Sequence, residues 1–165
     1  VRDDGWRLQS VGRQIERLDT LGHALARGFE LKLHTTDEGF ALLLSLFDSL
    51  ITYRARFQAR RELMPLLYLL VFDTDNPRSL AWVARTLRDR LRKLSRHDAS
   101  WADEASAALP MPEAWAIDDY AVLDGDGVPR RLVQALHDCV DTVRVMSDAI
   151  GRKLFAHVPD HNVWL

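Results

Sequence analysis

Apolar side chains recur every three or four residues along most of the chain, which is the spacing of one buried face of an α-helix. No segment shows the alternation of apolar and polar residues that is typical of a strand. The sequence therefore predicts an all-α fold, an antiparallel helical bundle of about five to six helices. The predicted helices cover about residues 5–33, 38–57, 60–72, 77–95, 101–109 and 129–157.

The first predicted helix carries an apolar stripe and a charged cluster on nearly opposite faces. Arg13, Glu16 and Arg17 are three and four residues apart, so they are neighbours on the helix surface. At 100° per residue this cluster centres opposite the stripe. We therefore expect it to face solvent, a groove or another piece of protein. The stripe consists of Leu8, Val11, Ile15, Leu18, Gly22, Leu25 and Phe29.

The second predicted helix is apolar nearly all round from Phe40 to Ile51, which predicts a central position in the bundle. The composition changes at the end of this helix, where aromatic and arginine side chains alternate from Tyr53 to Phe57. Arginines near a helix C-terminus are favoured by the helix dipole. On the sequence alone, a functional role for these arginines has equal weight.

Polar residues and prolines mark the later boundaries. Pro65 lies early in the third predicted helix, and Asn76 followed by Pro77 predicts Asn76 as the N-cap of the fourth. The run Asp124-Gly125-Asp126-Gly127 predicts a turn, since the later ligands of a calcium loop do not follow it. The apolar tail Val163-Trp164-Leu165 is expected to pack on the bundle.

Composition predicts one helical domain over residues 1–165, since 47% hydrophobic side chains in 165 residues can form one sizeable core. The chain begins Val-Arg-Asp-Asp without Met, and we expect it to be a fragment, the C-terminal half of a longer protein. The single cysteine, Cys139, excludes an intrachain disulfide and is compatible with the cytoplasm. No apolar run has the length of a membrane span, so we expect no membrane partner.

Charge is balanced over the whole chain but uneven along it. There are 22 Lys and Arg residues against 24 Asp and Glu residues. Residues 78–96 hold seven basic residues and one acid, whereas residues 98–126 hold eight acids and no Lys or Arg. Pairing within the chain is therefore favoured over a nucleic-acid surface, and no nucleic-acid partner is expected.

Motifs of metal and cofactor chemistry do not occur in the sequence. It contains no Glu-x-x-His, no Gly-rich phosphate loop and no nucleophile elbow. His157 and His161 have helical ligand spacing, but Pro159 between them breaks the helix that would align them. The sequence predicts no cofactor and no metal site, and this chain by itself does not resemble an enzyme.

Four blocks in order, over about residues 2–97, closely resemble the bacterial alpha-E domain family, which is named for its helical content and its Glu-Arg motif. Family members resemble tandem arrangements of two related halves, and the Asp-Gly-Trp opening of this chain is similar to the second half. The blocks are Arg2-Asp3-Asp4-Gly5-Trp6, Gly12-Arg13-x-Ile15-Glu16-Arg17-x-Asp19, Tyr53-Arg54-x-Arg56 and Phe72-Asp73-x-x-Asn76-Pro77-Arg78-Ser79.

The resemblance also implies partners. Family members are fused to, or encoded beside, circularly permuted ATP-grasp ligase-like proteins, transglutaminase-like proteins and a proteasome-like hydrolase, a context of peptide tagging or amide-bond chemistry. It implies ATP-grasp-type or transglutaminase-like proteins as partners. The first half of the same protein, or a homodimer mate, is expected to cover the face that carries the motif.

Three hypotheses account for the charged residues of these blocks. The first is a non-catalytic interaction domain that serves an ATP-grasp-type peptide or amide ligase system. In it Arg13, Glu16 and Arg17 hold a carboxylate-bearing partner or peptide, because guanidinium groups bind carboxylates bidentately. The second is an enzyme half in which Glu16 acts as a base or ligand and the arginines stabilise an oxyanion or phosphate. The third is structural, with Glu16 pairing Arg13 and Arg54 or Arg56 to join helices. The candidate binding residues are Arg13, Glu16, Arg17, Tyr53, Arg54, Arg56, Asp73, Asn76 and Arg78.

Overall fold

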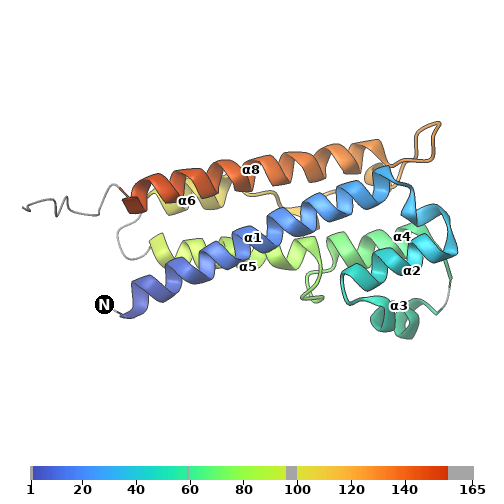
Figure 1. Cartoon of the computed structure of the whole chain (residues 1–165), viewed down its shortest axis with the longest axis horizontal. Helices are drawn as coiled ribbons and strands as arrows, with labels where there is room; N and C mark the ends of the chain where they lie inside the picture. Colours follow the sequence, from blue (N-terminus) through green and yellow to red (C-terminus); the bar gives the residue numbers. More distant parts are fainter. Residues whose placement is uncertain (1, 59, 96–99, 156–165) are drawn as a thin grey trace, which may run out of the picture.

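The computed structural model describes residues 2–58, 60–95 and 100–155. Over these residues the chain forms eight α-helices and no strand, so the predicted all-α bundle is confirmed (Figure 1). Two 3₁₀ turns, Leu33–Thr35 and Pro112–Ala114, and a π-helical turn, Tyr68–Phe72, lie between them. The helices are α1 (Arg2–Glu30), α2 (Asp37–Leu46), α3 (Leu50–Phe57), α4 (Leu63–Leu67), α5 (Leu80–Ser95), α6 (Ser100–Ala108), α7 (Ile117–Tyr120) and α8 (Arg130–Phe155).

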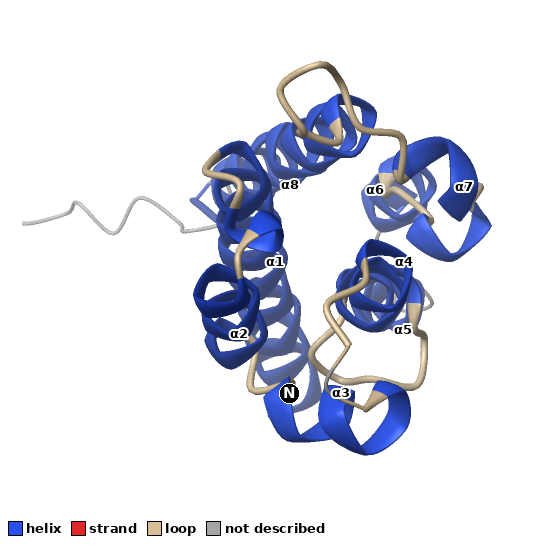
Figure 2. Cartoon of the chain, turned by 90° about the vertical axis from the view of Figure 1, so that its right-hand side faces the viewer, coloured by secondary structure: helices blue, strands red, loops and turns tan. Residues whose placement is uncertain are grey.

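The two longest helices, α1 and α8, run antiparallel along the bundle (Figure 1). Arg144 lies 3.3 Å from Asp19 at one level, and His137 Nε2 lies 2.6 Å from Glu30 Oε1 two turns further along. Seen along its length, the molecule has α1, α2 and α8 on one side and α4 to α7 on the other (Figure 2). In Figure 1, α1 runs between α8 and α5.

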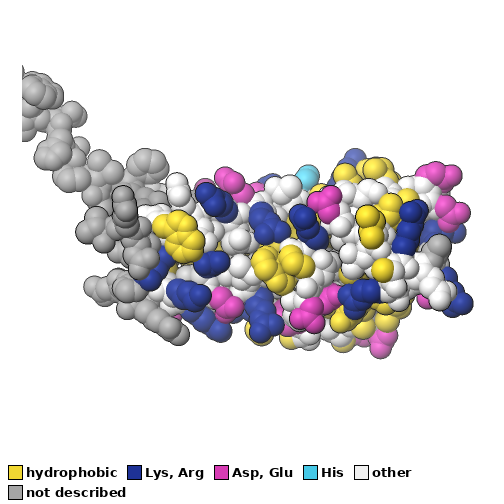
Figure 3. All heavy atoms as spheres, turned by 90° about the horizontal axis from the view of Figure 1, so that it is seen from below, with side chains coloured by type: hydrophobic (Ala, Val, Ile, Leu, Met, Phe, Trp, Pro, Cys, Tyr) yellow, Lys and Arg dark blue, Asp and Glu magenta, His cyan; other side chains and the backbone are white. Residues whose placement is uncertain are grey.

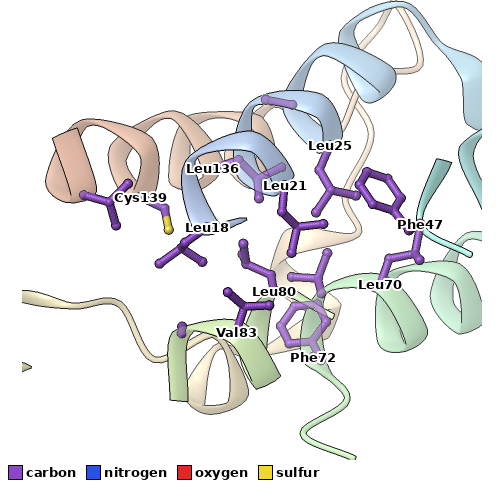
Figure 4. Packing of buried hydrophobic residues seen from close by; sticks show 14 of the residues in the cluster. Leu18, Leu21, Leu25, Phe47, Leu70, Phe72, Leu80, Val83, Leu136 and Cys139 are labelled. Carbon is purple, nitrogen blue, oxygen red and sulfur yellow. The ribbon is translucent and has the colours of Figure 1, made fainter. Parts of the chain in front are cut away.

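The helix α5 packs against α1 from the other side. The Arg90 guanidinium lies over the Trp6 ring at 5.5 Å, and the Arg17 guanidinium lies over the Trp82 ring at 5.7 Å, so the two helices are antiparallel. Figure 4 shows Leu18 of α1, Leu80 of α5 and Leu136 of α8 converging on one core. The predicted α1 stripe is confirmed as buried at Val11, Ile15, Leu18, Gly22, Leu25 and Phe29.

The predicted continuous helix over 38–57 is wrong, because the chain forms α2 and α3 with a break between them. Asp48 has φ of 49°, in the left-handed region, which an α-helix of L-residues does not continue through. The predicted central position is wrong too. Only one face of α2 packs on the core, and Leu42, Leu46 and Ile51 are 51%, 57% and 82% exposed.

The start of α5 also differs from the prediction. Its N-cap is Ser79, whose Oγ accepts a hydrogen bond from the Trp82 N–H at 3.1 Å, and not Asn76. Asn76 holds the preceding turn instead. Its Nδ2 donates to the Leu69 carbonyl at 2.9 Å, and its Oδ1 accepts from the Arg78 N–H at 3.1 Å.

The predicted turn before α8 is confirmed. Asp124 Oδ1 accepts hydrogen bonds from the backbone N–H groups of Asp126 and Val128, and Asp124 Oδ2 lies 2.6 Å from Arg130 Nε. These bonds lower the pKa of Asp124. The carboxylate is thus used inside the loop. The tail 159–165 and the pair His157 and His161 lie outside the described residues.

The 3₁₀ turn before α2 is tightly packed on both sides. A Cβ added to Gly39 would lie 2.4 Å from the Leu33 carbonyl oxygen, so only glycine fits there without a shift. His34 is buried, and its Nε2 lies 2.8 Å from the Gly127 carbonyl oxygen. Burial lowers the pKa of His34, and the bond to Gly127 offsets part of that effect. This turn joins the ends of α1, α2 and the loop before α8.

Charge pairing between α5 and the acidic segment is present at Arg88. This side chain is 6% exposed and donates to the Pro110 carbonyl at 2.8 Å and to Glu113 at 3.4 Å. On the face shown in Figure 3, Lys and Arg side chains are dispersed among acidic and apolar ones. Among the described residues, no helix combines the length and apolarity needed to cross a membrane.

Candidate functional site

A groove of about 490 Å³ opens between α1, the end of α2 and the start of α5. We call it the α1 groove. Its floor is the edge of the hydrophobic core, formed by Leu21, Phe47 and Val83 (Figure 4). The groove is lined by Arg13, Glu16, Arg17, Thr20, Leu21, Leu46, Phe47, Asp48, Arg78 and Val83.

Arg13 and Glu16 lie on one wall of the α1 groove, and both are exposed. Neither side chain makes a hydrogen bond or ion pair within the described part of the chain. The pairing of Glu16 with Arg13, Arg54 or Arg56 that the sequence allowed is therefore not found. The outward position predicted for the cluster from the helical period is confirmed.

Arg17 and Arg78 also line the groove, but each contacts the chain. Arg17 donates to the Pro77 carbonyl at 3.0 Å, and its guanidinium lies 5.7 Å from the centre of the Trp82 ring. Arg78 lies 3.3 Å from Asp48, and both side chains are more than half exposed. Exposed ion pairs contribute about 1 kcal/mol or less, so a ligand carboxylate can displace Asp48 from Arg78.

Arg56 and Asp73 lie away from the groove and form a pair of their own. Arg56 Nη1 is 2.6 Å from Asp73 Oδ2, and Asp73 is 2% exposed. The other carboxylate oxygen, Oδ1, accepts from the Asp75 N–H at 2.9 Å. The hydrogen bond to Asp73 raises the pKa of Arg56. This pair joins α3 to the end of the π-helical turn.

Tyr53, Arg54 and Asn76 do not reach the groove either. Tyr53 is 2% exposed, and its hydroxyl donates to the Arg60 carbonyl at 2.6 Å. Burial raises the pKa of this phenol. Arg54 lines a separate, smaller cleft, and Asn76 shapes the turn before α5. The structure therefore brings together Arg13, Glu16, Arg17 and Arg78, and leaves the other five candidates outside.

Sequence reasoning missed the wall of the groove opposite α1. Leu46 and Asp48 lie there because α2 ends between them, and the apolar run in this segment hides that break. Leu42 precedes Leu46 by one helical turn and is also half exposed, so it extends the apolar lip. The hydrophobic pattern of the sequence does not predict that these leucines are exposed.

The groove has the chemistry of a binding surface for an anion attached to an apolar body. Three guanidinium groups face two carboxylates, and apolar side chains form the floor and one lip. Within the described residues, no cluster of His, Cys, Asp and Glu could hold a metal ion. Burial raises the pKa of Cys139 to about 12, which makes its thiol a poor nucleophile in the folded chain.

Comparison with known families gives a match over nearly the whole chain. The Alpha-E model, described as a predicted alpha-helical domain with a conserved ER motif, matches residues 1–155. The sequence contains one Glu-Arg dipeptide, Glu16-Arg17, so the ER motif lies on the wall of the α1 groove.

Curated relatives include uncharacterised proteins of Mycobacterium bovis and of two strains of Mycobacterium tuberculosis. Each is 25% identical over 157 residues, which cover 91% of this chain and 17% of the relative. The chain thus spans about a sixth of the length of these relatives. No solved structure matches the chain.

Proposed function

The chain belongs to the Alpha-E family, and we propose that it is a non-catalytic docking domain whose α1 groove binds a carboxylate-bearing segment of a partner protein. The proposal rests on one observation above all. Arg13 and Glu16 lie in the groove without a partner in the described part of the chain. Guanidinium groups bind carboxylates with two parallel hydrogen bonds, and Arg13 has its fork available for such a bond.

The apolar lip supports a polypeptide over a small inorganic anion as the occupant. Leu42 and Leu46 are 51% and 57% exposed, one turn apart on α2. Contact with apolar side chains of a partner would remove this surface from water. A peptide with an acidic residue next to apolar ones would meet Arg13 on one wall and Leu46 on the other. Glu16 would then accept a hydrogen bond from a backbone N–H of the same peptide.

The proposed partner belongs to an ATP-grasp-type peptide or amide ligase system, or to the transglutaminase-like proteins. This part of the proposal comes from the resemblance of the four sequence blocks to the alpha-E family. The curated relatives are several times longer than this chain, so the partner can also be another segment of the same polypeptide. A homodimer mate is the remaining alternative.

The test is a binding assay with a purified ATP-grasp-type partner and with an acidic, leucine-containing peptide. Arg13→Gln removes the charge and keeps a polar side chain, and we expect about a tenfold loss of affinity. Arg85→Gln is the matched control, because Arg85 is exposed on α5, does not line the groove and has no ion pair among the described residues. Equal losses in the two variants would refute a specific role for the groove.

A second candidate function, an enzyme half, is favoured by the same free carboxylate at Glu16. There Glu16 would act as a base or ligand, and the arginines would stabilise an oxyanion or phosphate. A turnover assay with ATP and peptide, comparing wild type with Glu16→Gln, separates the two functions. Equal turnover with weaker binding supports docking, and a loss of turnover with unchanged binding supports catalysis.

A further inference from the structure

A second cleft, of about 220 Å³, lies between α2, α3 and the segment that leads into α4. We call it the Arg54 cleft. Its lining includes Arg54 of α3 and Arg60 and Arg61 of the connecting segment, all three exposed. It shares no lining residue with the α1 groove, so a role for the Arg54 cleft is independent of the function proposed for that groove.

The rim of the Arg54 cleft has excess positive charge. Asp37 is its one acidic lining residue, and this carboxylate accepts from Arg61 Nε at 2.9 Å. Arg61 also donates to the Thr35 carbonyl, which fixes it at the edge. Arg54 and Arg60 make no side-chain hydrogen bond or ion pair within the described residues. Two guanidinium groups are thus left to bind an anion.

The floor of the cleft is apolar and firmly built. Phe40, Leu44 and Tyr53 line it, and they are 6%, 1% and 2% exposed. The Phe40 and Tyr53 rings meet edge to face with centroids 5.3 Å apart. Tyr53 also donates its hydroxyl proton to the Arg60 carbonyl at 2.6 Å, so a core side chain holds the residue that carries a rim arginine. The cleft therefore exists before any ligand binds.

We propose that the Arg54 cleft is a binding site for a small organic anion, with a carboxylate or phosphate head held by Arg54 and Arg60 and an apolar body on the floor. The oxyanion head is the chemistry that guanidinium groups bind in planar, bidentate geometry. An apolar body would also cover Ala41 and Leu50, which line the cleft and are only half-buried, whereas a bare inorganic ion would leave them in contact with water.

A helix dipole does not account for this arrangement. Arg54 lies in the last turn of α3, where the dipole favours a cation. Arg56 lies in the same turn, is bound to Asp73 and already places a positive charge there. Arg60 and Arg61 come after the helix and face the same cleft. Three arginines around one apolar floor are better explained by a ligand than by one helix end.

The test is a titration of the whole chain with benzoate, phenyl phosphate, inorganic phosphate and benzyl alcohol, followed by NMR. Benzyl alcohol has the apolar body without the charge, and inorganic phosphate has the charge without the body. We expect saturable binding of at least one aromatic anion, at least tenfold tighter than that of benzyl alcohol or inorganic phosphate. The aromatic anion that binds more tightly identifies the head group.

Charge-removing variants complete the experiment. Arg54→Gln and Arg60→Gln should each weaken binding of the aromatic anion by about tenfold, because each removes a charge-assisted hydrogen bond. Arg85→Gln should leave it unchanged. All three side chains are exposed, so circular dichroism and thermal melts should match wild type. The proposal is overturned if neither aromatic anion binds, if either control ligand binds equally well, or if Arg85→Gln weakens binding as much as Arg54→Gln.

Discussion

The Arg56–Asp73 pair and the α1 groove contain the same chemical groups and use them in opposite ways. Asp73 is 2% exposed, and its carboxylate is occupied by Arg56 and by a backbone N–H. Arg13 and Glu16 are exposed and bind nothing in the described part of the chain. Burial of the carboxylate therefore separates a structural pair from a binding surface. We expect stability to depend on the first region and binding on the second.

Removing the buried carboxylate should have the largest effect. Asp73→Ala leaves the Arg56 guanidinium and the Asp75 N–H without their acceptor, and we expect the free energy of unfolding to fall by about 3 kcal/mol. Glu16→Ala should change it by less than about 0.5 kcal/mol, as for other exposed sites. Urea denaturation followed by circular dichroism measures both. Similar losses in the two variants would break the distinction between the two regions.

Two glycines extend the same contrast to the backbone. Gly39→Ala places a Cβ 2.4 Å from the Leu33 carbonyl oxygen, and we expect a loss of about 2 kcal/mol from the shift this forces. Gly12, beside Arg13 on the outward face of α1, has nothing within 4 Å of an added Cβ. Gly12→Ala should raise the free energy of unfolding by about 1 kcal/mol, the helix propensity difference.

Thermal melts of the two glycine variants provide the check, with opposite shifts in the midpoint expected. If Gly12→Ala also weakens partner binding in the assay described for Arg13, the partner approaches the helix backbone closely at Gly12. A lower midpoint for Gly12→Ala would show that the outward face of α1 is packed within the chain and would contradict the open groove.

The smallest effect concerns pH and His34. Burial lowers the pKa of His34 in the folded chain, so below its ordinary pKa of 6.5 the unfolded chain binds a proton that the folded chain does not. The stability that depends on neutral His34 is therefore fully present above pH 6.5 and is lost as the pH falls from there through the lower pKa of the folded chain. Urea midpoints between about pH 7.5 and 5.5 should decrease more in wild type than in His34→Gln. If the urea midpoints of the two proteins changed equally with pH, the pKa of His34 would be the same in the folded and unfolded chains.

Much of the fold could be predicted because α1, α5 and α8 have unbroken apolar periods. Ile15 and Leu18 are buried where the period places them, and Arg13 is exposed for the same reason. The break after α2 could not be predicted, since Asp48 adopts a left-handed backbone inside a run that has the pattern of a continuous helix. The left-handed backbone of this one residue, which the hydrophobic period does not indicate, thus creates the second wall of the groove.

Which candidate residues come together could be predicted only in part. Arg13, Glu16 and Arg17 share a helix face, and the helical period suffices to group them. The ion pair between Arg56 and Asp73 depends on where the π-helical turn ends. The end of that turn is set by tertiary packing and not by a local sequence pattern. No sequence pattern indicates that Arg54 and Arg56, two residues apart, serve different surfaces.

The packing of α1 against α8 has a consequence for how the chain folds. Glu30 and His137 are 107 residues apart in sequence, so the contacts that bury the α1 stripe are among the most distant the chain makes. Closing so long a loop slows folding. The packing of α1 against α8 cannot begin on the ribosome until α8 has been synthesised. Until then the part of the α1 stripe that packs on α8 stays exposed, and the nascent chain is open to chaperones or to premature association.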